Sequence, residues 1–211
     1  MNKNQESSNK VARIIIILST IIASLSIYIV LTVDLADKPL AGQGGAPSGE
    51  AQIGGEFMLT DQNGNQFSSE AMKGRLSIVY FGFTYCPDIC PTSLQKLTNV
   101  IATLEKYQID VLPIFITVDP ARDTPALLKE YLGHFHEKFI GLTGTDAQIR
   151  EVADLYKVFY AIAGDGSEGD KYMLDHSSFV YLMDKNGKYM KHFYMNSSPE
   201  EIIEYIRVNR R

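Results

Sequence analysis

Hydrophobic residues are distributed along this chain in two ways. Residues 14–33 form one continuous run, IIIILSTIIASLSIYIVLTV, without a charged side chain. Beyond residue 54, short apolar segments alternate with helical stripes instead. A helix made from the continuous run is about 30 Å long, which matches the hydrocarbon core of a bilayer. We therefore predict a transmembrane signal anchor at residues 14–33, with a cleaved signal peptide as the alternative.

The charges that flank this run predict its orientation. They are Lys3, Lys10 and Arg13 before it, and Asp34, Asp37 and Lys38 after it. Because positively charged flanks stay in the cytoplasm, residues 1–13 are expected there. Residues 34–211 are expected on the extracytoplasmic side, periplasmic or equivalent, which permits disulfides. The Gly-, Ala- and Pro-rich residues 34–53 predict a flexible tether, and residues 54–211 a single folded domain.

The remaining pattern predicts an α/β domain. The predicted strands are 56–61, 65–68, 76–82, 111–118, 139–142, 178–183 and 189–194, and the predicted helices are 91–107, 124–137, 145–159 and one that begins at 198. Residues 160–175 have no clear period and are expected to be irregular. This order indicates a mixed sheet with helices on both faces.

Composition narrows the class of protein only slightly. The 211 residues carry a formal net charge of −5 and no long block of like charges. Nucleic-acid binding is therefore not expected, since it needs a basic patch. A hydrophobic fraction of 45% is ordinary for a globular domain. The domain is expected to fold without disulfides to hold it together.

The chain contains two cysteines, Cys86 and Cys90, in the stretch GFTYCPDICP. They lie between predicted strand 76–82 and predicted helix 91–107, where open α/β sheets place ligands. The start of a helix also favours thiolate over thiol. The pair can close a disulfide, act as a redox pair or bind one soft metal ion.

The number of cysteines limits the choice of metal. Thiolates suit Cu(I), zinc and iron–sulfur clusters. An ordinary iron–sulfur cluster needs four cysteines, and structural zinc needs four Cys or His ligands, commonly in two pairs. Copper is satisfied by two thiolates and one imidazole, with a further ligand such as water or a carboxylate for Cu(II). The cysteine pair therefore favours copper.

Among the histidines, His176 is the candidate for a third ligand. It lies in YMLDHSS, on the segment expected to be irregular, just before a predicted strand. His134 and His136 fall on a predicted helix, where their i, i+2 spacing points them apart. His192 falls on an edge-like strand and is expected at the surface. We expect Asp88, Asp119 and Asp123 to cap helices or turns, with a role at the cysteines as the alternative. Met173 is expected in the core or at the surface, with Cu(I) binding as the alternative.

Four sequence blocks resemble the signatures of the SCO/SenC family. They are GFTYCPDICPTSL, VDPARDTP, FIGLTGT and DHSSFVYLMDKNG. The resemblance implies a membrane-anchored copper protein with a thioredoxin-like fold. It implies one copper ion per chain, as Cu(I) or Cu(II), bound by Cys86, Cys90 and His176. It also implies a partner, subunit II of cytochrome c oxidase, whose dinuclear copper A centre the family helps to assemble.

Three functions remain open at this point. The first is a copper metallochaperone, which binds and transfers but does not turn over a substrate. The second is a thiol-disulfide oxidoreductase in which Cys86 and Cys90 are the catalytic pair, although the usual motif has two intervening residues. The third is a peroxiredoxin-like peroxidase, for which Thr84 stands one position too close to Cys86. Another copper chaperone or a thioredoxin-like reductant is a possible further partner.

Overall fold

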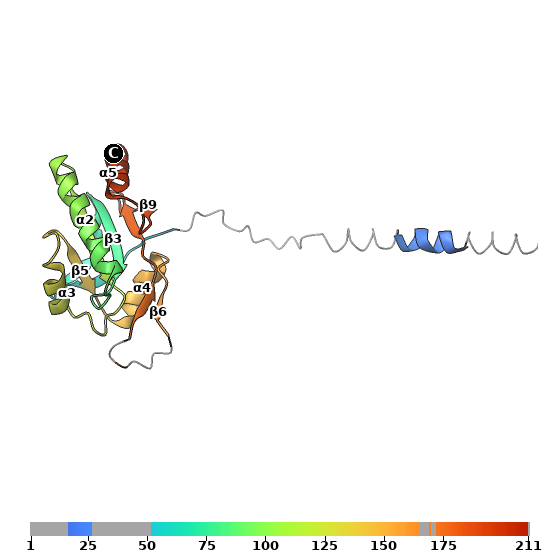
Figure 1. Cartoon of the computed structure of the whole chain (residues 1–211), viewed down its shortest axis with the longest axis horizontal. Coiled ribbons are helices and arrows are strands. Elements are labelled where there is room, and N and C mark those ends of the chain that lie inside the picture. The colour runs from blue at the N-terminus through green and yellow to red at the C-terminus, as the bar shows by residue number, and fades with distance from the viewer. Residues whose placement is uncertain (1–16, 27–51, 165–168, 170–171, 211) are drawn as a thin grey trace, which may run out of the picture. The chain divides into compact units, whose positions relative to one another are not determined.

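The computed structural model describes residues 17–26, 52–164, 169 and 172–210. The chain divides into two units, Met1–Ser48 and Gly49–Arg211. The second unit holds a sheet with helices packed against it (Figure 1).

In the first unit, residues 17–26 are helical. The predicted anchor at 14–33 extends beyond these residues on both sides. The predicted cytoplasmic segment 1–13 and residues 34–51 of the predicted tether lie outside the described residues. Within the described residues, no helix has both the length and the apolar character needed to cross a membrane.

The second unit is built on a mixed sheet. In the described part of the chain, seven strands form this sheet: β1 (Met58–Asp61), β2 (Gln66–Ser68), β3 (Leu76–Gly82), β4 (Val111–Thr117), β5 (Ile140–Thr143), β8 (Val180–Met183) and β9 (Tyr189–Phe193). Their order is β2-β1-β5-β4-β3-β8-β9. β3 is parallel to β4 and antiparallel to β8, which confirms the predicted mixed sheet. Every residue of β3 and β4 is buried, as in strands covered on both faces.

Helices cover both faces of the sheet (Figure 1). They are the short 3-10 helix η1 (Ser69–Met72) and the α-helices α2 (Ile89–Lys106), α3 (Pro125–Leu132), α4 (Asp146–Leu155) and α5 (Pro199–Asn209). On one face, Phe115 of β4 packs against Tyr131 of α3, with ring centroids 6.1 Å apart. On the other face, Phe81 of β3 packs against Tyr156, which caps α4, at 5.3 Å. The prediction of helices on both faces is therefore confirmed.

The helix predicted for residues 124–137 is shorter than expected, because α3 ends at Leu132. Gly133 closes it, and its N–H donates to the carbonyl of Lys129 at 3.1 Å. The following turn is held by α2, since the N–H of His136 donates to Thr98 Oγ1 at 3.2 Å. The prediction that His134 and His136 lie on this helix is thus wrong.

Residues 145–175 also depart from the prediction. α4 ends at Leu155, before Lys157 turns the chain with a left-handed φ of 57°. β6 (Tyr160–Ile162) and β7 (Leu174–His176) then pair antiparallel in a separate two-stranded sheet. The irregular structure predicted for 160–175 is therefore wrong at these two strands. Residues 165–168, 170 and 171 lie outside the described residues.

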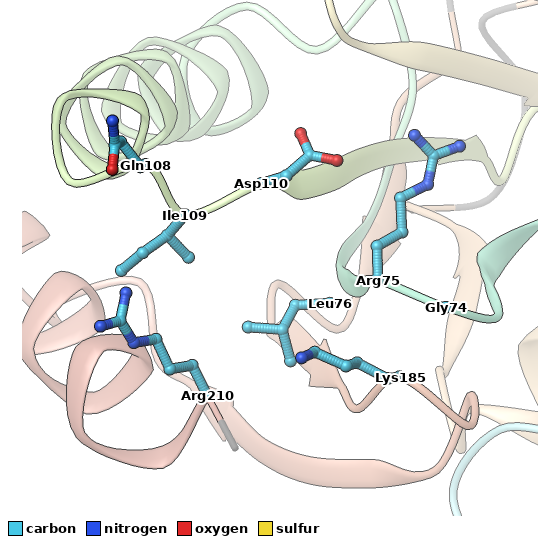
Figure 2. Close-up of a pocket in the computed structure, with 8 residues that line it drawn as sticks. All are labelled: Gly74, Arg75, Leu76, Gln108, Ile109, Asp110, Lys185 and Arg210. Carbon is cyan, nitrogen blue, oxygen red and sulfur yellow. The ribbon is translucent and has the colours of Figure 1, made fainter.

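A hollow of about 590 Å³ opens at the end of the sheet where β3 and β4 begin (Figure 2). Its lining consists of Gly74, Arg75, Leu76, Gln108, Ile109, Asp110, Lys185 and Arg210. Most of these side chains are exposed, and only Leu76 and Ile109 are buried. The two cysteines do not line it, because they follow the opposite, carboxyl end of β3.

Candidate metal centre

Cys86 and Cys90 lie in the connection from β3 to α2. Cys90 is in the first turn of α2 and fully buried, whereas Cys86 precedes the helix and is only half-buried. Both are free thiols. The backbone N–H of Cys90 points at Cys86 Sγ, 3.5 Å away. A helix start supplies such N–H groups, and they stabilise a thiolate.

Gly82 makes room for the buried cysteine. A Cβ placed on Gly82 would lie 2.8 Å from Cys90 Sγ and 2.9 Å from the ring of Phe115. Both separations are too short for real side chains. A larger residue at this position would therefore displace the Cys90 sulfur or the central strand.

His176 reaches the cysteines from β7. Its Nε2 lies 3.6 Å from Cys90 Sγ, and its ring packs edge-on against Phe83 at 5.8 Å. Its Nδ1 lies 3.1 Å from the carbonyl oxygen of Ser177. Because a carbonyl only accepts, Nδ1 is the donor in this contact, and Nε2 is the ring nitrogen that faces the sulfur. The structure thus brings together the three residues predicted as ligands, with His176 on a strand and not on the irregular segment that was predicted.

The pKa values of the two thiols are shifted in opposite directions. A hydrogen bond from the Cys90 thiol lowers the pKa of Cys86, and a hydrogen bond from His176 lowers it further, although burial opposes both. The same Cys86–Cys90 hydrogen bond, followed by burial, raises the pKa of Cys90. The pair therefore holds a thiolate at Cys86 and a protonated thiol at Cys90.

Tyr80 is a site residue that the sequence analysis did not identify. It is buried in β3, and its hydroxyl donates to Cys90 Sγ at 3.7 Å. Burial raises the pKa of this phenol, so it remains a donor. Strand periodicity could have identified it, because residues two apart in a strand lie on the same face. Tyr80 therefore lies on the same face as Gly82, which packs next to Cys90 Sγ.

Asp123 fixes the loop that precedes the cysteines. Its carboxylate accepts from the Thr84 N–H at 3.0 Å, the Thr84 hydroxyl at 2.5 Å and the Thr117 hydroxyl at 2.6 Å. Burial raises its pKa, while these donors oppose the rise. Because the Thr84 hydroxyl is directed to Asp123, the threonine does not serve the thiols as a peroxidase threonine would.

Three other residues for which the sequence suggested a role at the site are Asp88, Asp119 and Met173. Asp88 is the N-cap of α2, but its side chain makes no capping hydrogen bond. Asp119 is buried, and it accepts from Arg122 and Tyr172. Met173 is half-buried against the hydrophobic core. None of these three adds a clear fourth donor to the cysteines and His176.

The donor set fits a soft metal ion. It offers a thiolate, a thiol that can lose its proton, and an imidazole whose Nε2 faces the sulfur. In the part of the chain that the structure describes, no three His, Cys, Asp or Glu side chains are already in a geometry that encloses a metal. The centre is thus defined by its donors and their proximity.

The fold and the site together define a class of protein. This is a thioredoxin-like domain that carries a free dithiol and a histidine at the carboxyl end of its central strands. A family model described as SCO1/SenC matches residues 45–209. The chain therefore belongs to the SCO1/SenC family, and the resemblance found in the sequence blocks is confirmed.

Known proteins are similar to this chain over nearly its whole length or over most of its second unit. The SCO2-like protein of Rickettsia felis is 55% identical over 201 residues, 95% of this chain and 98% of that protein. The crystal structure of yeast Sco1 with copper bound has a TM-score of 0.71 and 42% identity, and the match covers 75% of this chain and 88% of that chain. BsSco, a member of the Sco family of cytochrome c oxidase assembly proteins with an identified disulfide switch, has a TM-score of 0.59 and 28% identity over 74% of this chain and 92% of that chain. These two solved chains consist almost wholly of the matching domain, so a fragment that contains Gly49–Arg211 is expected to fold alone.

Proposed function

We propose that this chain is a membrane-anchored copper chaperone that helps to assemble the copper A centre in subunit II of cytochrome c oxidase. The observation that carries the proposal is the meeting of the Cys86–Cys90 pair with His176, which is distant from both in sequence. Cys90 Sγ lies 3.6 Å from His176 Nε2. Copper-bound yeast Sco1 supports the nature of the cargo. The role of BsSco's family in oxidase assembly supports the process.

The cargo is one copper ion per chain, as Cu(I) or Cu(II). Cys86 Sγ, Cys90 Sγ and His176 Nε2 bind it, and Cys90 loses its proton in doing so. A water or carboxylate completes the set for Cu(II). Because Cys86 is half-exposed, thiolates of the target can reach the ion and replace the chain's ligands one at a time.

The location is proposed from the sequence. The uncharged run at 14–33 is long enough to anchor the chain as a single-pass signal anchor. The flanking charges favour a cytoplasmic N-terminus and an extracytoplasmic domain. In this orientation the dithiol would lie on the side where disulfides form.

A second candidate function is favoured by the unequal thiols. The Cys86 thiolate is accessible and the Cys90 thiol is buried beside it, as in a nucleophile with its resolving partner. Cys86 would attack a disulfide of the target to form a mixed disulfide. Cys90, after losing its proton, would then attack Cys86 Sγ, release the target as a dithiol and leave a Cys86–Cys90 disulfide. A thioredoxin-like reductant would restore the two thiols.

One experiment tests both functions. Fragment 38–211 is reduced and titrated with Cu(I) and with Cu(II), in the wild type, in Cys86→Ser/Cys90→Ser and in His176→Ala. We expect one copper per wild-type chain, loss of binding without the cysteines, and weaker binding without the histidine. Equal binding by all three proteins would rule out the copper site.

The same proteins are then incubated with an oxidised peptide that carries the target's two cysteines. Reduction of this peptide by wild type and by His176→Ala alike, in the absence of copper, would favour the oxidoreductase. Copper transfer to the pre-reduced peptide, lost in both variants, would favour the chaperone.

A further inference from the structure

Arg122 lies between two tyrosine rings beside the candidate metal centre. Its guanidinium carbon is 3.6 Å from the ring centroid of Tyr172 and 4.6 Å from that of Tyr85. Nε donates to Asp119 Oδ2 at 2.5 Å, and Nη1 donates to the backbone carbonyl of Tyr172 at 2.9 Å. The side chain of Arg122 is only 12% exposed. One cation therefore contacts two rings, one carboxylate and one carbonyl.

These contacts join the segments that carry the site. Tyr85 directly precedes Cys86, and Tyr172 lies four residues before His176. Asp119, which follows β4, provides the fixed point. Its N–H donates to Thr117 Oγ1 at 2.9 Å, and its Oδ1 accepts from the Tyr172 hydroxyl at 2.5 Å.

The main sheet does not fix His176 by itself. β7, which ends at His176, pairs with β6 in a separate two-stranded sheet. The register of β3 and β4 therefore sets the cysteines but not the imidazole. Side-chain contacts help to place Nε2 against Cys90 Sγ. They include the packing of the His176 ring on Phe83 and the contacts of Arg122 with Tyr172.

We propose that Arg122 is a positioning residue that holds the His176 segment against the cysteine loop. Its role in copper binding rests on the proposed function, whereas its role in placing His176 does not. Lysine keeps the charge but loses the planar fork that pairs with a carboxylate and a carbonyl while stacking between rings. Arg122→Lys is thus the informative change.

The test is a double-mutant cycle on fragment 38–211, with Arg122→Lys, His176→Ala and the double variant. The matched control is Arg207→Lys, because Arg207 also stacks on a tyrosine, Tyr107, at 4.5 Å and pairs with Glu204 at 2.9 Å. Cu(II) affinity is measured by competition with a chelator, and the thiolate-to-Cu(II) absorption and electron paramagnetic resonance spectra are recorded.

In the wild-type background we expect Arg122→Lys to weaken Cu(II) binding about 10- to 100-fold, as loss of an orienting partner does. The spectrum should shift toward that of His176→Ala while the thiolate band persists. In the His176→Ala background, Arg122→Lys should change little, because there is no imidazole left to place. An equal loss in both backgrounds would mean a general structural role and would overturn the proposal.

A copper-free measurement separates this inference from the proposed function. Amide hydrogen exchange at residues 173–177 should be faster in reduced Arg122→Lys than in wild type, and unchanged in Arg207→Lys. Failure of the wild type to bind copper would reject the proposed function, and unchanged exchange would reject the positioning role. If Arg122→Lys does not fold, Tyr172→Phe takes its place, since it keeps the ring and removes only the hydroxyl bond to Asp119. Tyr172→Phe should shift exchange in the same direction by a smaller amount.

Discussion

The two ends of the central sheet carry polar groups in opposite ways. Where β3 and β4 finish, Cys90 and Asp123 are buried, and each has polar partners within the protein. Where the same strands begin, Arg75, Lys185 and Arg210 stand exposed around the hollow of Figure 2. The charged side chains where the strands begin are exposed to solvent. The polar side chains where the strands end are buried and hydrogen-bond to other groups of the protein.

This difference shows which structural feature indicates the functional site. The hollow has a volume of about 590 Å³, but its charged side chains lie exposed to solvent. At the cysteine end, the hydrogen bond between the two thiols drives the pKa values of Cys86 and Cys90 apart. Perturbed ionisation combined with convergent donors is the better guide to a functional site than the size of a hollow.

The largest expected contrast between the two ends is in copper binding. Cys86→Ser/Cys90→Ser should abolish stoichiometric Cu(I) binding by fragment 38–211, because it removes both soft donors. Arg75→Gln/Lys185→Gln, at the other end, should leave the binding isotherm unchanged. Titration against a Cu(I) chelator measures both. Copper binding that followed the lysine and arginine instead of the cysteines would reverse the comparison.

The second contrast is between two carboxylates and concerns stability. Asp123→Ala leaves the Thr117 hydroxyl and the Thr84 N–H without their acceptor, so the free energy of unfolding should fall by about 3 kcal/mol. Asp110 is exposed and pairs with Lys138 at 3.0 Å, so Asp110→Ala should cost less than about 0.5 kcal/mol. Urea denaturation of the reduced, copper-free fragment measures both. Equal losses would contradict the proposed difference between the ends.

Asp123 should also make the stability of the fold depend on pH. Its pKa is raised in the folded protein, so the folded state binds its proton more tightly than the unfolded chain does. Its contribution to stability is therefore greatest below the unfolded pKa and declines as the pH rises through the folded pKa. Asp123→Asn should remove this decline from a series of denaturation curves taken across the acidic range. A wild-type slope that survives in Asp123→Asn must come from other groups.

The smallest contrast is between two phenols. Tyr80→Phe removes the hydroxyl that donates to Cys90 Sγ, which disfavours the reduced dithiol. The reduction potential should become about 20 mV more negative, equivalent to one hydrogen bond. Tyr107→Phe, near the other end, should not change it. Equilibration with a glutathione buffer gives both potentials, and a shift in Tyr107→Phe of the same size would show that the effect is not local.

The sequence predicted the centre of the fold well because local pattern determines it. β3 and β4 are continuous apolar strands, and Thr145 with Gln148 forms the predicted capping box of α4. The ends of helices were harder to predict. α3 stops at Leu132 because a turn after Gly133 is held by Thr98 of another helix, and no local signal reports such a contact.

The sequence predicted the candidate ligands of the site, but not the residues that contact and position them. Cys86, Cys90 and His176 stood out by residue type and by sequence blocks. Tyr80 did not, because its contact with Cys90 depends on how β3 packs against α2. Arg122 did not, because it contacts Tyr172, which is distant in sequence. His176 was expected on an irregular segment, whereas pairing with Tyr160 places it on β7. Tertiary contacts decided each of these points.

X-ray absorption at the copper edge tests the central claim most directly. Fragment 38–211 is loaded with one equivalent of Cu(I), in the wild type and in His176→Ala. We expect two sulfur donors and one nitrogen donor in the wild type, and the loss of the nitrogen alone in the variant. A first coordination shell that is the same in both proteins, or that holds fewer than two sulfurs in the wild type, would contradict it.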